Sequence, residues 1–298
     1  MKRLLTALAL IITTMVPLAT HAQDEPLKVV ASFSILGDMV KTIGGADVAV
    51  TTIVGPDTDT HVYEPTPADA KALAHAQLVF INGLGFEGWM SKLTQSTGYK
   101  GTIITATDGI KTHTMDDEGA VVTDPHAWQS VANARIYAKN ITAALIKALP
   151  AKASAITVRA NIYDKQLADL DAWVHTQFKD VPQAARTIIT SHDAFGYFGL
   201  AYNITFMAPE GVNTDTEPTA ADVARLTDQI KAAHAKTVFL ENMTSARLIN
   251  QIAKDTGAVI GGTLYADALS PAKGEASTYI DLMRHNVGLL ANSLKRKQ

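Results

Sequence analysis

The 298-residue sequence contains no cysteine. This absence excludes disulfide bonds, thiolate metal ligands, cysteine nucleophiles and a lipid-modified N-terminal cysteine. Long apolar runs are missing after the first 22 residues, so no later segment is predicted to cross a bilayer. Basic residues form no cluster away from the two ends. Lys and Arg total 26 against 29 Asp and Glu, which gives a net charge of −3 and argues against nucleic-acid binding.

The first 22 residues have the pattern of a secretory signal peptide. Lys2 and Arg3 precede a largely apolar run over 4–19, and small residues stand at the −3 and −1 positions of a cleavage site after Ala22. The run is shorter than the roughly 20 residues that a membrane-spanning helix needs. We therefore expect an exported, soluble chain. Because no cysteine is present to carry a lipid, we expect it to be free in the periplasm and not lipid-anchored.

Short β-rich runs alternate with amphipathic segments in two series. The first series of predicted strands is 28–33 (KVVASF), 49–54 (AVTTIV), 78–82 (LVFIN) and 102–105 (TIIT), and the second is 187–191 (TIITS), 205–207, 237–241 (TVFLE) and 258–263. Alternation of strands and helices predicts an α/β fold with two lobes and mainly parallel sheets. The expected organisation is a signal peptide over 1–22, an N-terminal lobe over 23–149, a connecting helix over 150–182 and a C-terminal lobe over 183–298.

The connecting segment is predicted to be one long helix. Pro150 and Pro182 bracket a stretch without internal Pro or Gly, and its apolar residues recur every three or four positions. These residues are Ile156, Ala160, Tyr163, Leu167, Leu170 and Val174. At 1.5 Å per residue, the helix would reach roughly 40 Å, enough to run along both lobes and to restrict them to small tilts.

Three of the nine histidines follow predicted strands or begin helical turns. His61 lies in PDTDTHVYEPTP, His126 in DPHAW and His192 in SHDAFGYF, and Asp267 follows the strand at 258–263. Ligands of parallel α/β sheets gather at the carboxyl ends of the strands. The other histidines have polar neighbours and are predicted to be solvated, including His113 in the polar loop 111–124.

Three imidazoles and one carboxylate form a complete tetrahedral ligand set for a divalent cation such as Zn²⁺. The wide spacing carries no local signature, so the residues leave open a second interpretation, in which each histidine only bonds nearby backbone. On the site interpretation, His61 and His126 come from the first lobe, and His192 and Asp267 come from the second.

The motifs TDTHVYEPTPAD, DPHAW, SHDAFGYF and LYADALS resemble those of the metal-binding solute-binding proteins of ABC transporters that import zinc or manganese. The resemblance covers essentially the whole chain after the signal segment. It implies two α/β lobes joined by a long helix, with a metal held in the cleft by His61, His126, His192 and Asp267. It also implies partners: a membrane permease with its cytoplasmic ATPase. We expect the chain to act as a monomer, without nucleic acid.

The third ligand position varies between His and Glu in the family that the chain resembles. An imidazole there favours Zn²⁺ over Mn²⁺, so we expect zinc as the cargo, with Mn²⁺ or Fe²⁺ as the alternative. A zinc-dependent hydrolase would need an open coordination position and a general base, for which Glu64 and Glu241 are candidates; a structural or supporting role is expected for both. An adhesive surface protein is a further alternative that no sequence feature favours.

Overall fold

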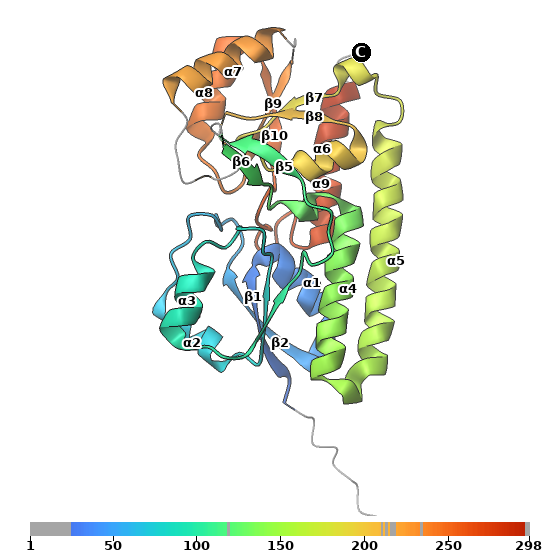
Figure 1. Cartoon of the computed structure of the whole chain (residues 1–298). Coiled ribbons are helices and arrows are strands. Elements are labelled where there is room, and N and C mark those ends of the chain that lie inside the picture. Colours follow the sequence, from blue (N-terminus) through green and yellow to red (C-terminus); the bar gives the residue numbers. More distant parts are fainter. Residues whose placement is uncertain are drawn as a thin grey trace, which may run out of the picture.

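The computed structural model describes residues 25–117, 120–209, 211, 214, 219–232 and 235–295. The predicted signal peptide lies outside the described residues. Two lobes, each built around a parallel sheet, are stacked along a pair of long helices (Figure 1). The predicted α/β architecture with mainly parallel sheets and one long helix is confirmed.

The first lobe contains a four-stranded sheet in the order β2-β1-β3-β4, with every pair parallel. Its strands are β1 (Leu27–Phe33), β2 (Val48–Val54), β3 (Leu78–Ile81) and β4 (Thr102–Thr105), and its helices are α1 (Ser34–Gly44), α2 (Pro67–His75) and α3 (Met90–Thr97). All four strands fall where the sequence predicted them. The β2–α2 connection, which carries His61, leaves the carboxyl end of the sheet.

The second lobe repeats the design with the order β10-β9-β7-β8, again all parallel. Its strands are β7 (Thr187–Ile189), β8 (Thr205–Met207), β9 (Thr237–Glu241) and β10 (Val259–Leu264), and its helices are α6 (Gly196–Tyr202), α7 (Ala220–Ala232), α8 (Ala246–Thr256) and α9 (Tyr279–Lys295). The ladder between β9 and β10 shifts register between Ile260 and Thr263, and this shift sets Leu264 opposite Glu241.

The long helix α5 (Ala153–Phe178) runs beside both lobes, as predicted, and all six of its predicted apolar residues are buried. It packs against α1 of the first lobe and against α6 and α9 of the second. The sequence pattern did not single out its antiparallel neighbour α4 (Val131–Ala148), which lies along it (Figure 1). Because α4 and α5 pack along their length, the two lobes are joined along a helical hairpin and not along a single connecting helix.

The prediction of a polar loop over 111–124 is wrong. This segment contains an antiparallel hairpin of β5 (Thr114–Asp117) and β6 (Ala120–Thr123). Short 3₁₀ turns complete the described elements: η1 (Gly45–Asp47), η2 (Ala127–Gln129), η3 (Pro150–Lys152) and η4 (Gln183–Ala185).

In the described part of the chain, no single helix is long and apolar enough to cross a membrane. The bent pair Val131–Ala148 and Pro150–Phe178 meets that requirement only jointly, with an angle of 117° between its halves.

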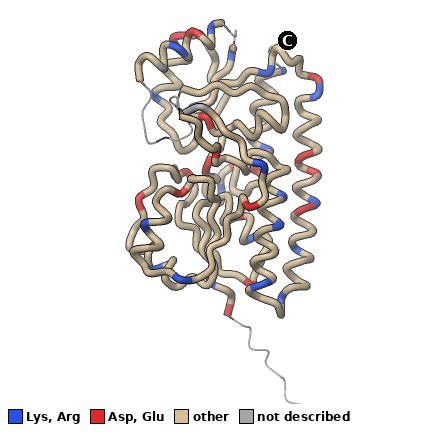
Figure 2. Tube along the Cα trace, in the orientation of Figure 1, with Lys and Arg blue, Asp and Glu red and all other residues tan. Residues whose placement is uncertain are grey.

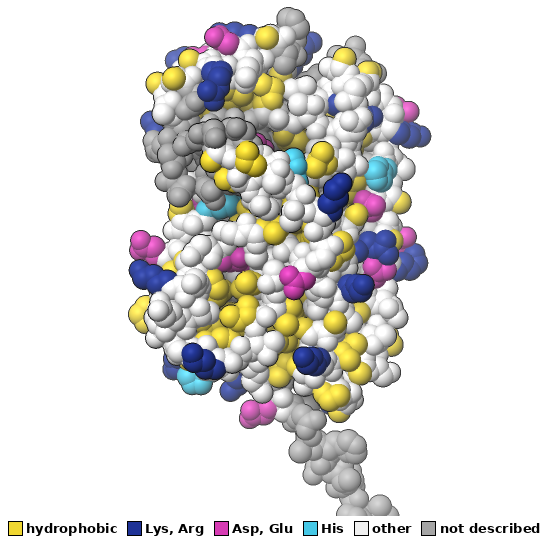
Figure 3. All heavy atoms as spheres, in the orientation of Figure 1, with side chains coloured by type: hydrophobic (Ala, Val, Ile, Leu, Met, Phe, Trp, Pro, Cys, Tyr) yellow, Lys and Arg dark blue, Asp and Glu magenta, His cyan; other side chains and the backbone are white. Residues whose placement is uncertain are grey.

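One hydrophobic core continues through both lobes. It includes Phe33 from the first sheet, Leu170 from α5 and Tyr279 from α9, and a smaller second cluster lies around α7 and α8. Charged residues are scattered along both lobes (Figure 2), and their side chains form no continuous stripe of Lys and Arg on the face shown (Figure 3). The continuous core means that the two lobes are joined by packing as well as by the chain.

Candidate metal centre

His61 reaches the junction of the lobes from the loop after β2. Its backbone N–H donates to Asp59 Oδ1 over 2.8 Å, a local turn that bends the loop back toward the sheet. Its ring packs edge-on against Phe86, with ring centroids 4.8 Å apart, and its side chain is only 2 % exposed. The ring therefore points inward although its loop lies at the surface.

His126 lies between β6 and η2 and is fully buried. Asp124 Oδ1 accepts hydrogen bonds from the His126 backbone N–H over 2.9 Å and from ring Nδ1 over 2.8 Å. Asp124 therefore orients the His126 ring. With the ring proton on Nδ1, the lone pair of Nε2 is free to bind a cation.

His192 follows β7 and is held by Glu241 at the end of β9. Glu241 Oε1 accepts from the backbone N–H of Ser191 over 2.8 Å and of His192 over 3.1 Å, and Glu241 Oε2 accepts from ring Nδ1 of His192. Glu241 is buried and lies beside the ring on the side away from the other histidines, which supports the predicted supporting role rather than that of a general base.

Asp267 follows β10 and is fully buried, yet neither of its oxygens makes a hydrogen bond within the described structure. Oδ2 lies 3.2 Å from Nε2 of His61 and 3.2 Å from Nε2 of His192, and Oδ1 lies 3.7 Å from Nε2 of His126. A buried carboxylate without hydrogen bonds is costly unless a positive charge compensates it. Three ring nitrogens around one carboxylate provide the place for that charge.

The four predicted residues converge on one point. Their ligand atoms all lie within 4.8 Å of one another, and the Nε2 atoms of His61 and His126 are 3.2 Å apart. Burial by itself lowers the pKa of His126, but Asp267 and Asp124 outweigh it and raise that pKa to about 9. Burial likewise opposes the ionised form of Asp267, but His192 and His126 hold its pKa well below the usual value. The site strongly favours positive charge beside Asp267.

His113, predicted to be solvated, is half-buried instead and belongs to the surroundings of the site. Its backbone N–H donates to the Tyr197 hydroxyl over 3.0 Å, and that hydroxyl donates to the Asp124 carbonyl over 3.2 Å. Sequence reasoning missed Phe86 and Tyr197 because each acts through a contact between distant segments.

Comparisons with known proteins identify the family. The family model described as "Zinc-uptake complex component A periplasmic" matches residues 29–293. The chain belongs to this family. The resemblance to metal-binding solute-binding proteins, drawn from the four motifs, is therefore confirmed.

Relatives within the family are named for three different metals. The manganese-binding lipoprotein MntA of Halalkalibacterium halodurans is 33 % identical over 277 residues, covering 93 % of this chain and 91 % of the relative. The iron-binding protein YfeA of Yersinia pestis is 32 % identical over 288 residues, covering 94 % and 92 %. The periplasmic zinc-binding protein TroA of Treponema pallidum has a similar structure, with a TM-score of 0.85, 30 % identity and coverage of 91 % and 99 %.

The comparisons contradict the expectation of a protein without a lipid anchor. The MntA relative is named a lipoprotein, and so are relatives from Bacillus subtilis, Lactococcus lactis and Streptococcus pneumoniae. The expectation of a free periplasmic protein is therefore wrong, because these relatives are named as lipoproteins. It relies on one compositional feature, the absence of cysteine, which says nothing about how the relatives are held.

Proposed function

We propose that this chain is a solute-binding protein that captures one divalent metal ion with His61, His126, His192 and Asp267 and delivers it to an ABC importer. The observation that carries the proposal is the convergence of three Nε2 atoms on a buried carboxylate that has no hydrogen bond in the described structure. Two of the three rings have their other nitrogen bonded to a carboxylate, the usual support for histidine metal ligands.

Zn²⁺ is the cargo that the donor set favours. Three imidazoles and one carboxylate match the tetrahedral preference of Zn²⁺, whereas Mn²⁺ and Fe²⁺ bind comparable sites more weakly. The names of the relatives MntA and YfeA favour Mn²⁺ or Fe²⁺ as the alternative. Selection in the cell depends on metal supply as well as on affinity, so the chemistry of the site gives the intrinsic preference.

A transport role fits the site better than catalysis. Four protein ligands fill a tetrahedral ion and leave no position for a water or substrate, while catalytic zinc sites keep one position open. The buried carboxylates near the site, Asp124 and Glu241, are both engaged with histidine rings. We propose that the ion passes unchanged to a membrane permease powered by its ATPase, and that the chain does this as a monomer.

The experiment is metal titration of purified protein stripped of metal. We expect one Zn²⁺ per chain and a raised melting temperature, because only the folded chain assembles the four ligands. Competition between Zn²⁺ and Mn²⁺ at equal free concentrations should favour Zn²⁺; preference for Mn²⁺ would replace zinc by the alternative.

Histidine variants test the ligand set in the same titration. The triple variant His61→Ala, His126→Ala, His192→Ala should lose stoichiometric binding. His75→Ala provides the matched control, because His75 is exposed on α2 and, among the described contacts, its ring bonds only the Lys71 carbonyl. Undiminished zinc binding by the triple variant would overturn the assignment of the site.

A further inference from the structure

Asp267 belongs by sequence to the second lobe, but the residues beside it are bonded to the first. The carbonyl of Ala266 accepts two hydrogen bonds, from Trp128 Nε1 over 2.9 Å and from Gln129 Nε2 over 2.8 Å. Trp128 and Gln129 form the η2 turn that directly follows His126. The same short turn therefore fixes His126 and the residue that precedes Asp267.

The residues after Asp267 are held from the same side. The backbone N–H of Leu269 donates to Ser34 Oγ over 2.9 Å, at the start of α1. The carbonyl of Leu269 accepts from the backbone N–H of Asp57 over 3.0 Å, in the loop that carries His61. Asp267 is thus bracketed by first-lobe partners, and its second-lobe contact at Ala268, from Asn242 Nδ2, is longer at 3.3 Å.

His192 is held in the opposite way. Among the described contacts of its segment, Thr190 N–H donates to the Met207 carbonyl, and Ser191 and His192 donate to Glu241. All of these partners lie in the second lobe. The second sheet therefore carries His192 with it. Near Asp267, the second lobe bonds the backbone at Leu264 and Tyr265, and after Asp267 only through the longer contact at Ala268 among the described hydrogen bonds.

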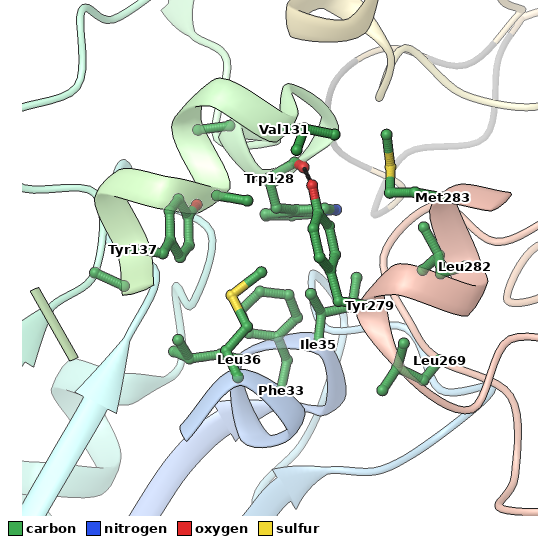
Figure 4. Close-up of a cluster of buried hydrophobic side chains, with 14 of the residues drawn as sticks. Phe33, Ile35, Leu36, Trp128, Val131, Tyr137, Leu269, Tyr279, Leu282 and Met283 are labelled. Atoms are coloured by element: carbon green, nitrogen blue, oxygen red, sulfur yellow. Dashed lines mark hydrogen bonds between the residues drawn. The ribbon is translucent and has the colours of Figure 1, made fainter. Parts of the chain in front are cut away.

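Packing makes the η2 turn a rigid anchor. Trp128 lies among Phe33 and Ile35 from the first lobe and Tyr279 from α9 (Figure 4). Its ring centroid is 4.9 Å from that of Phe33, and its carbonyl accepts a hydrogen bond from the Tyr279 hydroxyl over 2.7 Å. Gln129 is also fully buried, so neither donor can change partner without opening the core.

We propose that Trp128 and Gln129 are positioning residues that make Asp267 a ligand of the first lobe, so that His192 is the only ligand that the second lobe can withdraw. This inference rests on the proposed metal-binding function. Release then begins with the loss of one bond rather than two, and His61, His126 and Asp267 remain together as a three-ligand half-site. The two-and-two division expected from the sequence order is replaced by three and one.

Structures of the metal-free and zinc-bound protein test this directly. We expect the distance between His126 Nε2 and Asp267 Oδ1 to be conserved when the metal is absent, and the distance between His192 Nε2 and Asp267 Oδ2 to open. Movement of Asp267 away from His126 together with His192 would overturn the proposal. Unchanged distances for both pairs would also overturn it, because no ligand would then withdraw.

Two matched variants test the positioning role by rate. Gln129→Leu removes a buried donor to Ala266 on the first-lobe side, and Asn286→Leu removes an equally buried amide that bonds the adjacent Tyr265 backbone from α9. Both should lower the melting temperature. Only Gln129→Leu should speed zinc dissociation into excess chelator, by about tenfold, the size expected for one buried hydrogen bond.

Equal dissociation rates in the two variants would contradict the positioning role. Zinc stoichiometry measured in the same samples separates this inference from the proposed function. One ion per chain with equal rates would overturn only the inference, whereas no bound zinc in the unmodified protein would overturn the function and with it the inference.

Discussion

The carboxylate of Glu241 bonds His192 twice, at the backbone N–H over 3.1 Å and at ring Nδ1. The pairing requires the ring proton on Nδ1 and presents Nε2 to the point where the other ligands meet. The strand order explains the contact, because β9 lies between β7, which precedes His192, and β10, which precedes Asp267. Glu241 at the end of the middle strand is therefore placed between the two ligands that follow its neighbours.

Glu241→Gln should weaken zinc binding by about 10- to 100-fold, the range seen when such supporting groups of metal sites are lost. The amide keeps an acceptor for the backbone but removes the charge that orients the ring and strengthens Nε2 as a donor. Isothermal titration of metal-stripped protein measures the effect.

Glu87→Gln is the control for that change. Glu87 is a buried carboxylate that likewise accepts two consecutive backbone N–H groups, of Asn82 and Gly83, and contacts no histidine in the described hydrogen bonds. It should alter stability while zinc affinity changes less than about twofold. A similar loss of affinity in both variants would assign the Glu241 effect to general destabilisation.

His192→Glu tests the choice of metal, with a condition that only the structure reveals. A carboxylate at 192 hardens the ligand set and favours Mn²⁺, but it would be buried beside Glu241, and two buried carboxylates repel one another. We expect the single variant to be destabilised and to bind both metals poorly. The double variant His192→Glu, Glu241→Gln should recover stability and shift the Zn²⁺/Mn²⁺ ratio toward Mn²⁺ in competition titrations. An unchanged ratio in the double variant would show that residue 192 does not set the preference.

Gly196→Ala should change the orientation of the His126 ring indirectly, through Asp124. A Cβ at position 196 would lie 2.5 Å from Asp124 Oδ2 and 3.1 Å from His113 Cδ2. Asp124 must shift to make room, and it orients the His126 ring, so we expect both zinc affinity and melting temperature to fall. In the control Gly288→Ala, the added Cβ meets nothing within 4 Å, and the helix α9 should gain about 0.5–1 kcal/mol in stability with unchanged affinity. Normal zinc affinity in Gly196→Ala would mean that Asp124 is not needed to hold the ring.

Asp38 gives the fold a pH dependence separate from the metal site. Burial raises its pKa to about 6, despite the hydrogen bond from the Tyr279 backbone, with Asp281 adding to the rise and Lys41 opposing it. Tyr163 on α5 faces it as well. Because the folded pKa lies above the ordinary 3.8, ionisation costs stability, and the cost grows between about pH 4 and pH 6 and is complete above pH 6.

Asp38→Asn keeps a hydrogen-bond acceptor and removes the charge. The metal-stripped variant should gain up to about 3 kcal/mol in free energy of unfolding at pH 8 relative to the unmodified protein, and little at pH 4. Urea denaturation at both pH values measures this. Asp164→Asn should behave oppositely, since Arg135 lowers the pKa of Asp164 and the charge there is favourable at neutral pH. If the free energies of unfolding of Asp38→Asn and the unmodified protein differ equally at pH 4 and pH 8, ionisation of Asp38 does not destabilise the fold.

The sequence by itself determined the alternation of strands and helices, the buried face of α5 and the four residues that meet at the junction of the lobes. These features are local: periodic burial appears within each segment, and a ligand at the end of a parallel strand is marked by the strand that precedes it. The motifs around His61, His126, His192 and Asp267 were joined into one site by their resemblance to those of a known family, because the spacing of the residues alone leaves a second interpretation open.

Only the tertiary structure decided which groups support those ligands and which lobe holds them. Glu241 and Asp124 orient rings through contacts set by strand order and by the turn at η2, and the hairpin β5–β6 replaces a predicted loop. The hydrogen bonds from Trp128 and Gln129 to Ala266, and from Leu269 to Ser34, lie on either side of Asp267 and join residues far apart in the chain. Hydrogen bonds of this kind depend on the packing of separate elements against one core, and a linear pattern carries no record of that packing.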